Sequence, residues 1–172
     1  MKKLIILCLA VLFLFTACGG RPMPEGVPDD FAVYYAMGID TTQMNILDTY
    51  ENYIQKDLIK KGTARAEYIP TDEEIVAIYD KITELELWTM PNNVRSDDFI
   101  VTPLTLFEIR FTLDGNTYEI LADTSITQST WKNENITSEQ AEALNTFCRF
   151  LHELMMDTDE YQSLPDSEGG YM

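Results

Sequence analysis

Two side chains in this sequence have the chemistry of a catalyst, the single histidine His152 and the cysteine Cys148. Both fall within residues 138–156, where apolar side chains recur every three or four positions, as in an amphipathic helix. Cys148 lies on the apolar stripe itself, whereas a reactive thiolate needs an exposed, electropositive setting. His152 lies at the border of the stripe beside Glu153, and no Gly-flanked serine of the nucleophile-elbow type accompanies it. We therefore expect a non-enzymatic protein with Cys148 in its core.

Metal ligands are sparse in the sequence. Asp157, Asp159 and Glu168 fit positions 1, 3 and 12 of a calcium-binding loop, but position 6, which needs glycine, is Gln162. The single histidine and the few cysteines do not supply the ligand set of a zinc site. We expect neither a metal nor another cofactor.

The N-terminal residues 1–17 have the parts of a secretory signal peptide. Two lysines precede an apolar run over 4–17, which ends on the small residue Ala17. A helix over this run would be about 21 Å long, shorter than the roughly 30 Å hydrocarbon core of a bilayer. A cleaved signal is therefore a better interpretation than a permanent transmembrane helix.

The end of this segment, FTAC, resembles the lipobox of bacterial lipoproteins. In that family the cysteine sulfur receives a diacylglyceryl group and the peptide bond before the cysteine is cut. The resemblance implies lipidation of Cys18, cleavage after Ala17, and a mature protein held by its lipid on the extracytoplasmic face of the cell membrane. The alternative is an ordinary signal cut after Ala17 with no lipid.

The mature chain would be strongly acidic. Loss of Lys2 and Lys3 with the signal takes the formal net charge from −17 to −19. This balance argues against a nucleic-acid partner, which requires a basic surface. It is consistent with a solvated surface that maintains solubility, or with a cationic protein partner. Since Cys148 would be the only unmodified thiol, no internal disulfide is expected and the core must hold the fold.

Candidate ligand-binding residues are basic and aromatic. Lys60 and Lys61 lie in the basic segment KDLIKKGTAR, at a predicted turn, where they could form a basic tip or simply block edge pairing. Aromatic residues that could line a ligand surface are Tyr34, Tyr50, Tyr53, Trp88 and Trp131, with core packing as the alternative. We take Trp131, Lys60 and Lys61 as the candidate ligand surface.

The distribution of apolar residues predicts one α+β domain over 31–156. A Gly- and Pro-rich tether over 18–30 precedes it, and a loose acidic tail over 157–172 follows it. The predicted architecture is an antiparallel sheet with two amphipathic helices packed on one face, because this arrangement covers every apolar stripe.

Strands are predicted from alternating apolar residues. Residues 31–37 alternate clearly and predict a strand. Residues 46–57 fit helical spacing as well as a strand; we predict a strand that forms a hairpin with 63–69. A two-residue turn at Asp114 and Gly115 predicts a second hairpin. Its opposed pairs would be Phe111 with Tyr118, Ile109 with Ile120, Phe107 with Ala122, and, on the other face, Arg110 with Glu119.

Two capping boxes predict where the helices begin. Thr71 is followed three residues later by Glu74, which predicts a helix over 72–87. Thr137 and Gln140 have the same spacing and precede the helix over 138–156.

This order of features resembles small lipoproteins of Gram-positive bacteria that have no assigned function. The resemblance rests on the lipobox and tether, the early strand region, the helix PTDEEIVAIYDKITELELW, the DG hairpin, the final helix and the ending YQSLPDSEGGYM. It implies no catalytic residue. We expect a membrane-tethered, non-enzymatic binding or accessory domain. The alternative is an acidic immunity-like or inhibitor protein that masks a cationic enzyme or toxin.

Overall fold

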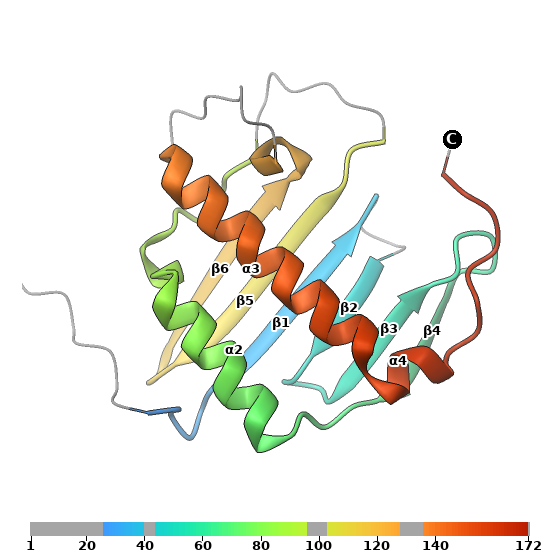
Figure 1. Ribbon diagram of the computed structural model, residues 1–172, viewed down its shortest axis with the longest axis horizontal. Coiled ribbons are helices and arrows are strands. Elements are labelled where there is room, and N and C mark those ends of the chain that lie inside the picture. Colours follow the sequence, from blue (N-terminus) through green and yellow to red (C-terminus); the bar gives the residue numbers. More distant parts are fainter. Residues whose placement is uncertain (1–25, 40–43, 96–102, 128–135, 172) are drawn as a thin grey trace, which may run out of the picture.

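The structure is a computed structural model that describes residues 26–39, 44–95, 103–127 and 136–171. Six strands form one antiparallel sheet in the order β4-β3-β2-β1-β5-β6. Helices α2 (Asp72–Glu84) and α3 (Ser138–Asp157) lie across one face of this sheet (Figure 1). The predicted α+β architecture is confirmed. Within the described ranges, no helix is long and apolar enough to span a membrane.

One central pairing of the sheet, that of β1 with β5, joins segments that are distant in sequence. In chain order the strands are β1 (Ala32–Gly38), β2 (Met44–Asp48), β3 (Tyr53–Asp57), β4 (Thr63–Glu67), β5 (Leu106–Leu113) and β6 (Asn116–Asp123). Strand β1 begins one residue later than predicted and pairs with β2 on one side and β5 on the other. The later segment 106–123 therefore extends the sheet beyond β1.

The core lies between the sheet and the two helices. Alternate strand residues point to the helices, and they meet the apolar stripes of α2 and α3 in one cluster. Fully buried members include Tyr35, Leu47, Ile54, Ile109, Phe111, Ile78, Ile82, Leu144, Phe147 and Leu151. Burial of each such side chain contributes about 1.5–3 kcal/mol to folding, so this layer is the main source of stability for the packing of the helices on the sheet.

Both predicted capping boxes are present. The Thr71 hydroxyl accepts from the Glu74 N–H (3.2 Å), and the Glu74 carboxylate accepts from the Thr71 N–H (2.7 Å). The second box joins Thr137 and Gln140 in the same way at the start of α3. Helix α2 ends earlier than predicted, because Glu86 adopts a left-handed backbone conformation (φ 50°) before the 3-10 turn η1 (Leu87–Thr89).

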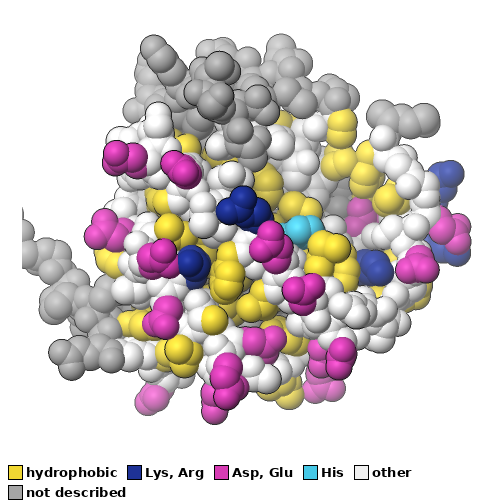
Figure 2. Space-filling view, viewed as in Figure 1, with side chains coloured by type: hydrophobic (Ala, Val, Ile, Leu, Met, Phe, Trp, Pro, Cys, Tyr) yellow, Lys and Arg dark blue, Asp and Glu magenta, His cyan; other side chains and the backbone are white. Residues whose placement is uncertain are grey.

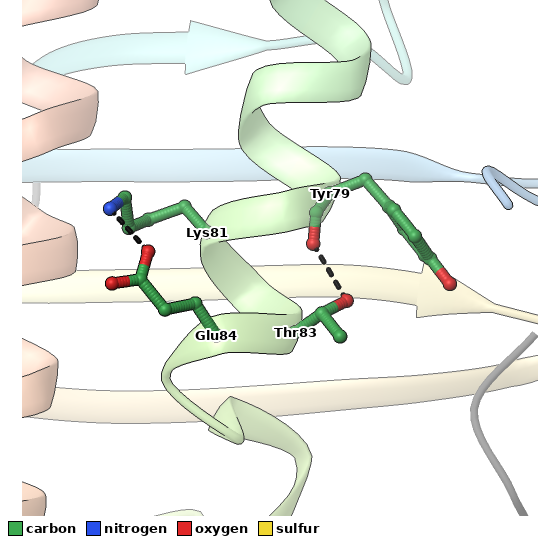
Figure 3. A network of polar contacts seen from close by, with 4 residues as sticks. All are labelled: Tyr79, Lys81, Thr83 and Glu84. Atoms are coloured by element: carbon green, nitrogen blue, oxygen red, sulfur yellow. Dashed lines mark hydrogen bonds and ion pairs between the residues drawn. The ribbon is translucent and has the colours of Figure 1, made fainter. Parts of the chain in front are cut away.

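The last turn of α2 is stabilised locally and also lies against α3. Figure 3 shows the Thr83 hydroxyl donating to the Tyr79 carbonyl (2.9 Å), and the Lys81 ammonium paired with Glu84. The Lys81 nitrogen also lies 6.0 Å from the ring centroid of Phe150 on α3. One lysine therefore links the two helices on their solvent side.

The hairpin of β5 and β6 has the predicted register throughout. All four predicted pairs occur, and the turn residues Asp114 (φ 48°) and Gly115 (φ 76°) both have positive φ, as a tight hairpin turn requires. The Asp30 carboxylate accepts from the N–H groups of both turn residues, at 3.0 and 2.6 Å. The last residue of the predicted tether is therefore docked on this hairpin.

Residues 46–57 are not one strand. The predicted hairpin partner is correct, since β3 pairs with β4, but a turn at 49–52 separates β2 from β3. The Asp48 carboxylate makes this turn by accepting from the N–H groups of Tyr50 (2.9 Å) and Glu51 (3.1 Å). The turn contains neither glycine nor proline, so the sequence pattern did not reveal it.

The C-terminal segment is not the loose tail expected from its composition. Residues 159–163 form α4 (Asp159–Ser163), and the chain then returns to the turn after β3 (Figure 1). There the Glu168 N–H donates to the Leu58 carbonyl (3.2 Å), and the Ser167 hydroxyl donates to the Asp57 carbonyl (2.6 Å). The prediction was wrong because acidic composition does not reveal hydrogen bonding to a distant part of the chain.

Candidate binding surface

The second face of the sheet, opposite α2 and α3, carries a row of aromatic and charged side chains. We call this the helix-free face. Strand register places one residue from each strand side by side across it, in the order Glu67, Tyr53, Asp48, Tyr34, Arg110 and Glu119. The next row contains Ala36 and Ile46, which form a second apolar cluster with Met44 and the edges of Tyr34, Tyr53 and Leu106. A small apolar cluster thus lies beside the row of polar and aromatic side chains on this face.

Arg110 organises the middle of the helix-free face. Its guanidinium lies 5.0 Å from the ring centroid of Tyr34 and 5.2 Å from that of Tyr50. The Tyr50 hydroxyl in turn shares a hydrogen bond of 2.9 Å with the hydroxyl of Thr112. Such contacts between a cation and two rings hold all three side chains in defined positions.

Arg65 has the corresponding role near the edge formed by β4. Its guanidinium lies 4.2 Å from the ring centroid of Tyr53, and its Nε donates to the Gln55 side-chain oxygen (2.7 Å). The Gln55 amide nitrogen donates to the Met44 carbonyl (2.8 Å). Arg65 is therefore tied both to the Tyr53 ring and to a hydrogen-bonded side chain on the neighbouring strand.

The tyrosine hydroxyls of this face remain protonated at neutral pH. Burial, followed by the nearby Glu108 carboxylate, raises the pKa of Tyr34 to about 12. Burial also raises the pKa of Tyr50 and that of Tyr53 above the ordinary value. Each phenol can therefore donate a hydrogen bond, in addition to its apolar ring.

Two hollows in the described part of the chain lie away from this face. One, of about 380 Å³, lies between α2 and α3 and is lined by Glu74, Phe150, Glu153, Leu154, Asp157 and Thr158. The other lies where residues 26–30 meet Asp114 and Gly115. The described residues include no group of three or more histidine, cysteine or carboxylate side chains that could hold a metal ion.

The candidate ligand residues chosen from the sequence are not brought together as one site. Lys61 forms an ion pair with Glu168, and the side chain of Lys60 lies close to Gly169, so the chain's own C-terminal segment occupies this turn. Trp131 lies outside the described residues, as do Ala17 and Cys18.

The wider basic segment is also divided between the two faces of the sheet. Lys56 lies 5.1 Å from the ring centroid of Tyr161 on the helix side, whereas Arg65 lies over Tyr53 on the helix-free face. A single basic patch is thus not formed by these residues.

The two side chains with catalytic chemistry lie in or beside the core. Cys148 is buried, as predicted, and desolvation raises the pKa of its thiol, which keeps it protonated and unreactive. His152 is half-buried, and burial lowers the pKa of its imidazole. Its buried Nδ1 has no hydrogen-bond partner among the described residues. Neither side chain is therefore presented as part of a nucleophile and base pair.

The chain was compared with protein families and with curated proteins. No protein family matches the chain, and no curated protein is detectably similar to it.

Proposed function

We propose that this protein is a membrane-tethered, extracytoplasmic binding domain that holds a basic protein partner on the helix-free face of its sheet. The observation that carries the proposal is the cluster in which the Arg110 guanidinium lies over the rings of both Tyr34 and Tyr50. In this proposal the protein is not an enzyme and needs no cofactor.

The composition of the face favours a protein partner. Tyrosine and arginine are the residues most often found at the energetic centres of protein interfaces, because they combine large apolar area with hydrogen-bond donors. The cluster is broad and lies on a sheet, rather than in one of the two hollows described above. Prior ordering of the side chains lowers the entropy lost on binding.

The charge of the face favours a basic partner. The row across the strands carries Glu67, Asp48 and Glu119, and Glu108 lies next to Tyr34, whereas the two arginines are both stacked on rings. Glu67 and Glu119 are exposed. A partner with lysine or arginine around an apolar centre would match this arrangement.

The proposed anchor is the lipid on Cys18. Residues 18–25, fully extended, reach about 26 Å at roughly 3.3 Å per residue, so they can separate the domain from the lipid headgroups. Two acyl chains contribute on the order of 20 kcal/mol of membrane binding at about 0.8 kcal/mol per methylene, which makes anchoring effectively permanent.

The proposal is tested by site-specific photo-crosslinking in the source cells, using the full chain. A photoreactive residue at Thr112 or Glu119 lies on the helix-free face, and one at Asp80 on α2 provides the control. We expect one partner to crosslink at the two sheet positions and not at the control. The purified complex should weaken with rising salt, because exposed charge pairs are screened. Equal crosslinking at all three positions, or none, would refute the proposal.

A pair of alanine substitutions separates an effect on partner binding from an effect on folding. Arg110→Ala removes the cation that contacts the two rings, and Arg149→Ala, on α3, is its matched control. Both chains should fold, as judged by circular dichroism. We expect only Arg110→Ala to lose most of the partner crosslink.

A second candidate function is inhibition of a cationic enzyme or toxin through the other face. Three carboxylates, Glu74, Glu153 and Asp157, line the hollow between α2 and α3. Figure 2 shows acidic side chains spread over this helix-bearing face with hydrophobic side chains between them. If crosslinks arise at Asp80 instead of at the sheet positions, and the captured protein is an enzyme whose activity falls on binding, this second function is favoured.

A further inference from the structure

The two edges of the sheet differ in how they are covered. At the β6 edge, residues 92–94 run parallel to the strand. The Val94 N–H donates to the Leu121 carbonyl, and the Leu121 N–H donates to the Asn92 carbonyl, both at 2.8 Å. Strand β4 forms the opposite edge, and no described segment pairs with its outer side. An uncovered edge strand is a template for another strand.

The register of β3 and β4 shows which backbone groups face outward. Just beyond the two ends of their ladder, the Tyr68 N–H donates to the Asn52 carbonyl (3.0 Å), and the Leu58 N–H donates to the Gly62 carbonyl (2.8 Å). Hydrogen-bonded and non-hydrogen-bonded pairs alternate along an antiparallel ladder. The even-numbered residues of β4 therefore bond to β3, and the odd-numbered residues direct their N–H and carbonyl groups away from the sheet.

The outward-facing residues are Thr63, Arg65 and Glu67, and all three are exposed. The inward-bonded residues are Ala64 and Ala66, whose side chains are partly exposed and point to the helix side of the sheet. The free edge thus offers outward-facing backbone N–H and carbonyl groups. The strand also carries one positive side chain, Arg65, and one negative side chain, Glu67.

We infer that β4 pairs in an antiparallel manner with β4 of a second copy of this chain, with Ala66 at the two-fold axis. In this register Arg65 lies opposite Glu67 of the second copy, and the symmetry repeats the same pair on the other side of the axis. Both residues carry outward-facing backbone groups, as the hydrogen-bonded positions of the new ladder require. Opposite charges placed directly across a strand pair are favourable.

Ile69, two residues beyond the end of β4, extends the proposed pairing with the second copy. Ile69 is 68% exposed and precedes Pro70, which favours an extended conformation at Ile69. In the proposed register Ile69 lies opposite Thr63 of the second copy, so both residues at this position are β-branched, as strands prefer. A second copy therefore provides both the opposite charges for Arg65 and Glu67 and a β-branched residue opposite Ile69. An unrelated extended segment would need to have all of these side chains at the right spacing.

This inference does not depend on the partner proposed for the helix-free face. The pairing would join two helix-free faces into one continuous twelve-strand surface. If both copies are held on a membrane, the restricted space raises the effective concentration of one copy for the other.

The inference is tested by disulfide formation in the full chain in detergent. Ala66→Cys places two thiols directly opposite at a non-hydrogen-bonded pair, where Cα atoms are about 4.5 Å apart and a disulfide fits. Ala64→Cys is the matched control, because it lies on the same strand and face with similar exposure. In the proposed register its two copies are about 13 Å apart, four residues along the strand at roughly 3.3 Å each.

We expect the peptide linked through position 66 to form at least about tenfold faster than the peptide linked through position 64. Mass spectrometry of the linked peptides excludes crosslinks through other cysteines. Glu67→Arg in the Ala66→Cys chain places arginines opposite each other and should slow the crosslink about fivefold. Exchange of both charges, Arg65→Glu with Glu67→Arg, should restore it. Equal rates at the two positions, or no crosslink at position 66, would overturn the inference.

Discussion

The turn between β2 and β3 depends on a buried carboxylate, and Asp48→Ala is the sharpest test of that interpretation. Asp48 is 3% exposed, and its Oδ1 accepts from two backbone N–H groups, those of Tyr50 and Glu51. Removing the acceptor leaves both donors without their partner in a half-buried turn. Since water can reach part of this turn, the loss is about 1 kcal/mol for each bond, or about 2 kcal/mol in total.

The matched variant is Asp48→Asn, which keeps an oxygen at the same position but removes the negative charge. We expect it to cost only about 0.5–1 kcal/mol, because neutral acceptors form weaker hydrogen bonds than charged ones. The assay is urea unfolding followed by tryptophan fluorescence, with thermal unfolding as a second measurement. A loss of 2 kcal/mol lowers Tm by about 4–8 °C for a chain of this size.

Two results would refute this reasoning. A change below about 0.5 kcal/mol in Asp48→Ala would mean that the turn does not depend on the carboxylate. Equal losses in the alanine and asparagine variants would mean that charge elsewhere on the face, rather than the two N–H groups, holds Asp48 in place.

Three further predictions concern the helix cap, the histidine and the proposed anchor. Thr71→Ala removes the acceptor for the Glu74 N–H and should lower the unfolding free energy by about 1 kcal/mol in the same urea assay, whereas no change would contradict the cap. Burial lowers the pKa of His152 in the folded state below its value in the unfolded chain. Protonation therefore favours the unfolded state, and stability should fall as pH drops below about 6.5. His152→Gln should show a smaller fall between pH 7.5 and 5.5, and identical pH profiles would exclude this role. Cys18→Ala should abolish incorporation of labelled fatty acid, and equal labelling of both chains would disprove the lipid anchor.

Local signals in the sequence were sufficient for the starts of α2 and α3 and for one hairpin. The two capping boxes and the Asp114-Gly115 turn involve residues within a few positions of one another, and their geometry follows from the backbone itself. The turn that separates β2 from β3 is local too. It has no glycine or proline; the Asp48 carboxylate accepts from two of its N–H groups, and Asn52 ends it in a left-handed conformation (φ 55°).

The candidate binding surface could be predicted only in part. Alternation in β1 indicated that Tyr34 and Tyr35 point to opposite faces, and Tyr34 was one of several aromatic candidates. The order of the strands decides its neighbours, because β1 lies between β2 and a strand that begins almost seventy residues later in the chain. No local pattern predicts that Arg110 will contact the rings of both Tyr34 and Tyr50.

The basic turn shows why composition alone was a poor guide to the ligand surface. Lys61 is exposed and charged, as predicted, but Glu168 from the far end of the chain is paired with it. The two basic residues that lie on strands, Lys56 and Arg65, are also placed on different faces of the sheet. A cluster in sequence is therefore not a cluster in space when it crosses a hairpin.

The positions of the charges have a consequence for binding. The arginines of the helix-free face, Arg65 and Arg110, are stacked on tyrosine rings, whereas the carboxylates Glu67 and Glu119 are exposed at opposite ends of the same row. A basic partner of the proposed kind that approaches this face of a single copy therefore meets negative charge at the rim and aromatic rings toward the centre. That order favours electrostatic attraction of a basic surface before close contact with the tyrosines, and it predicts that added salt slows association more than it speeds dissociation.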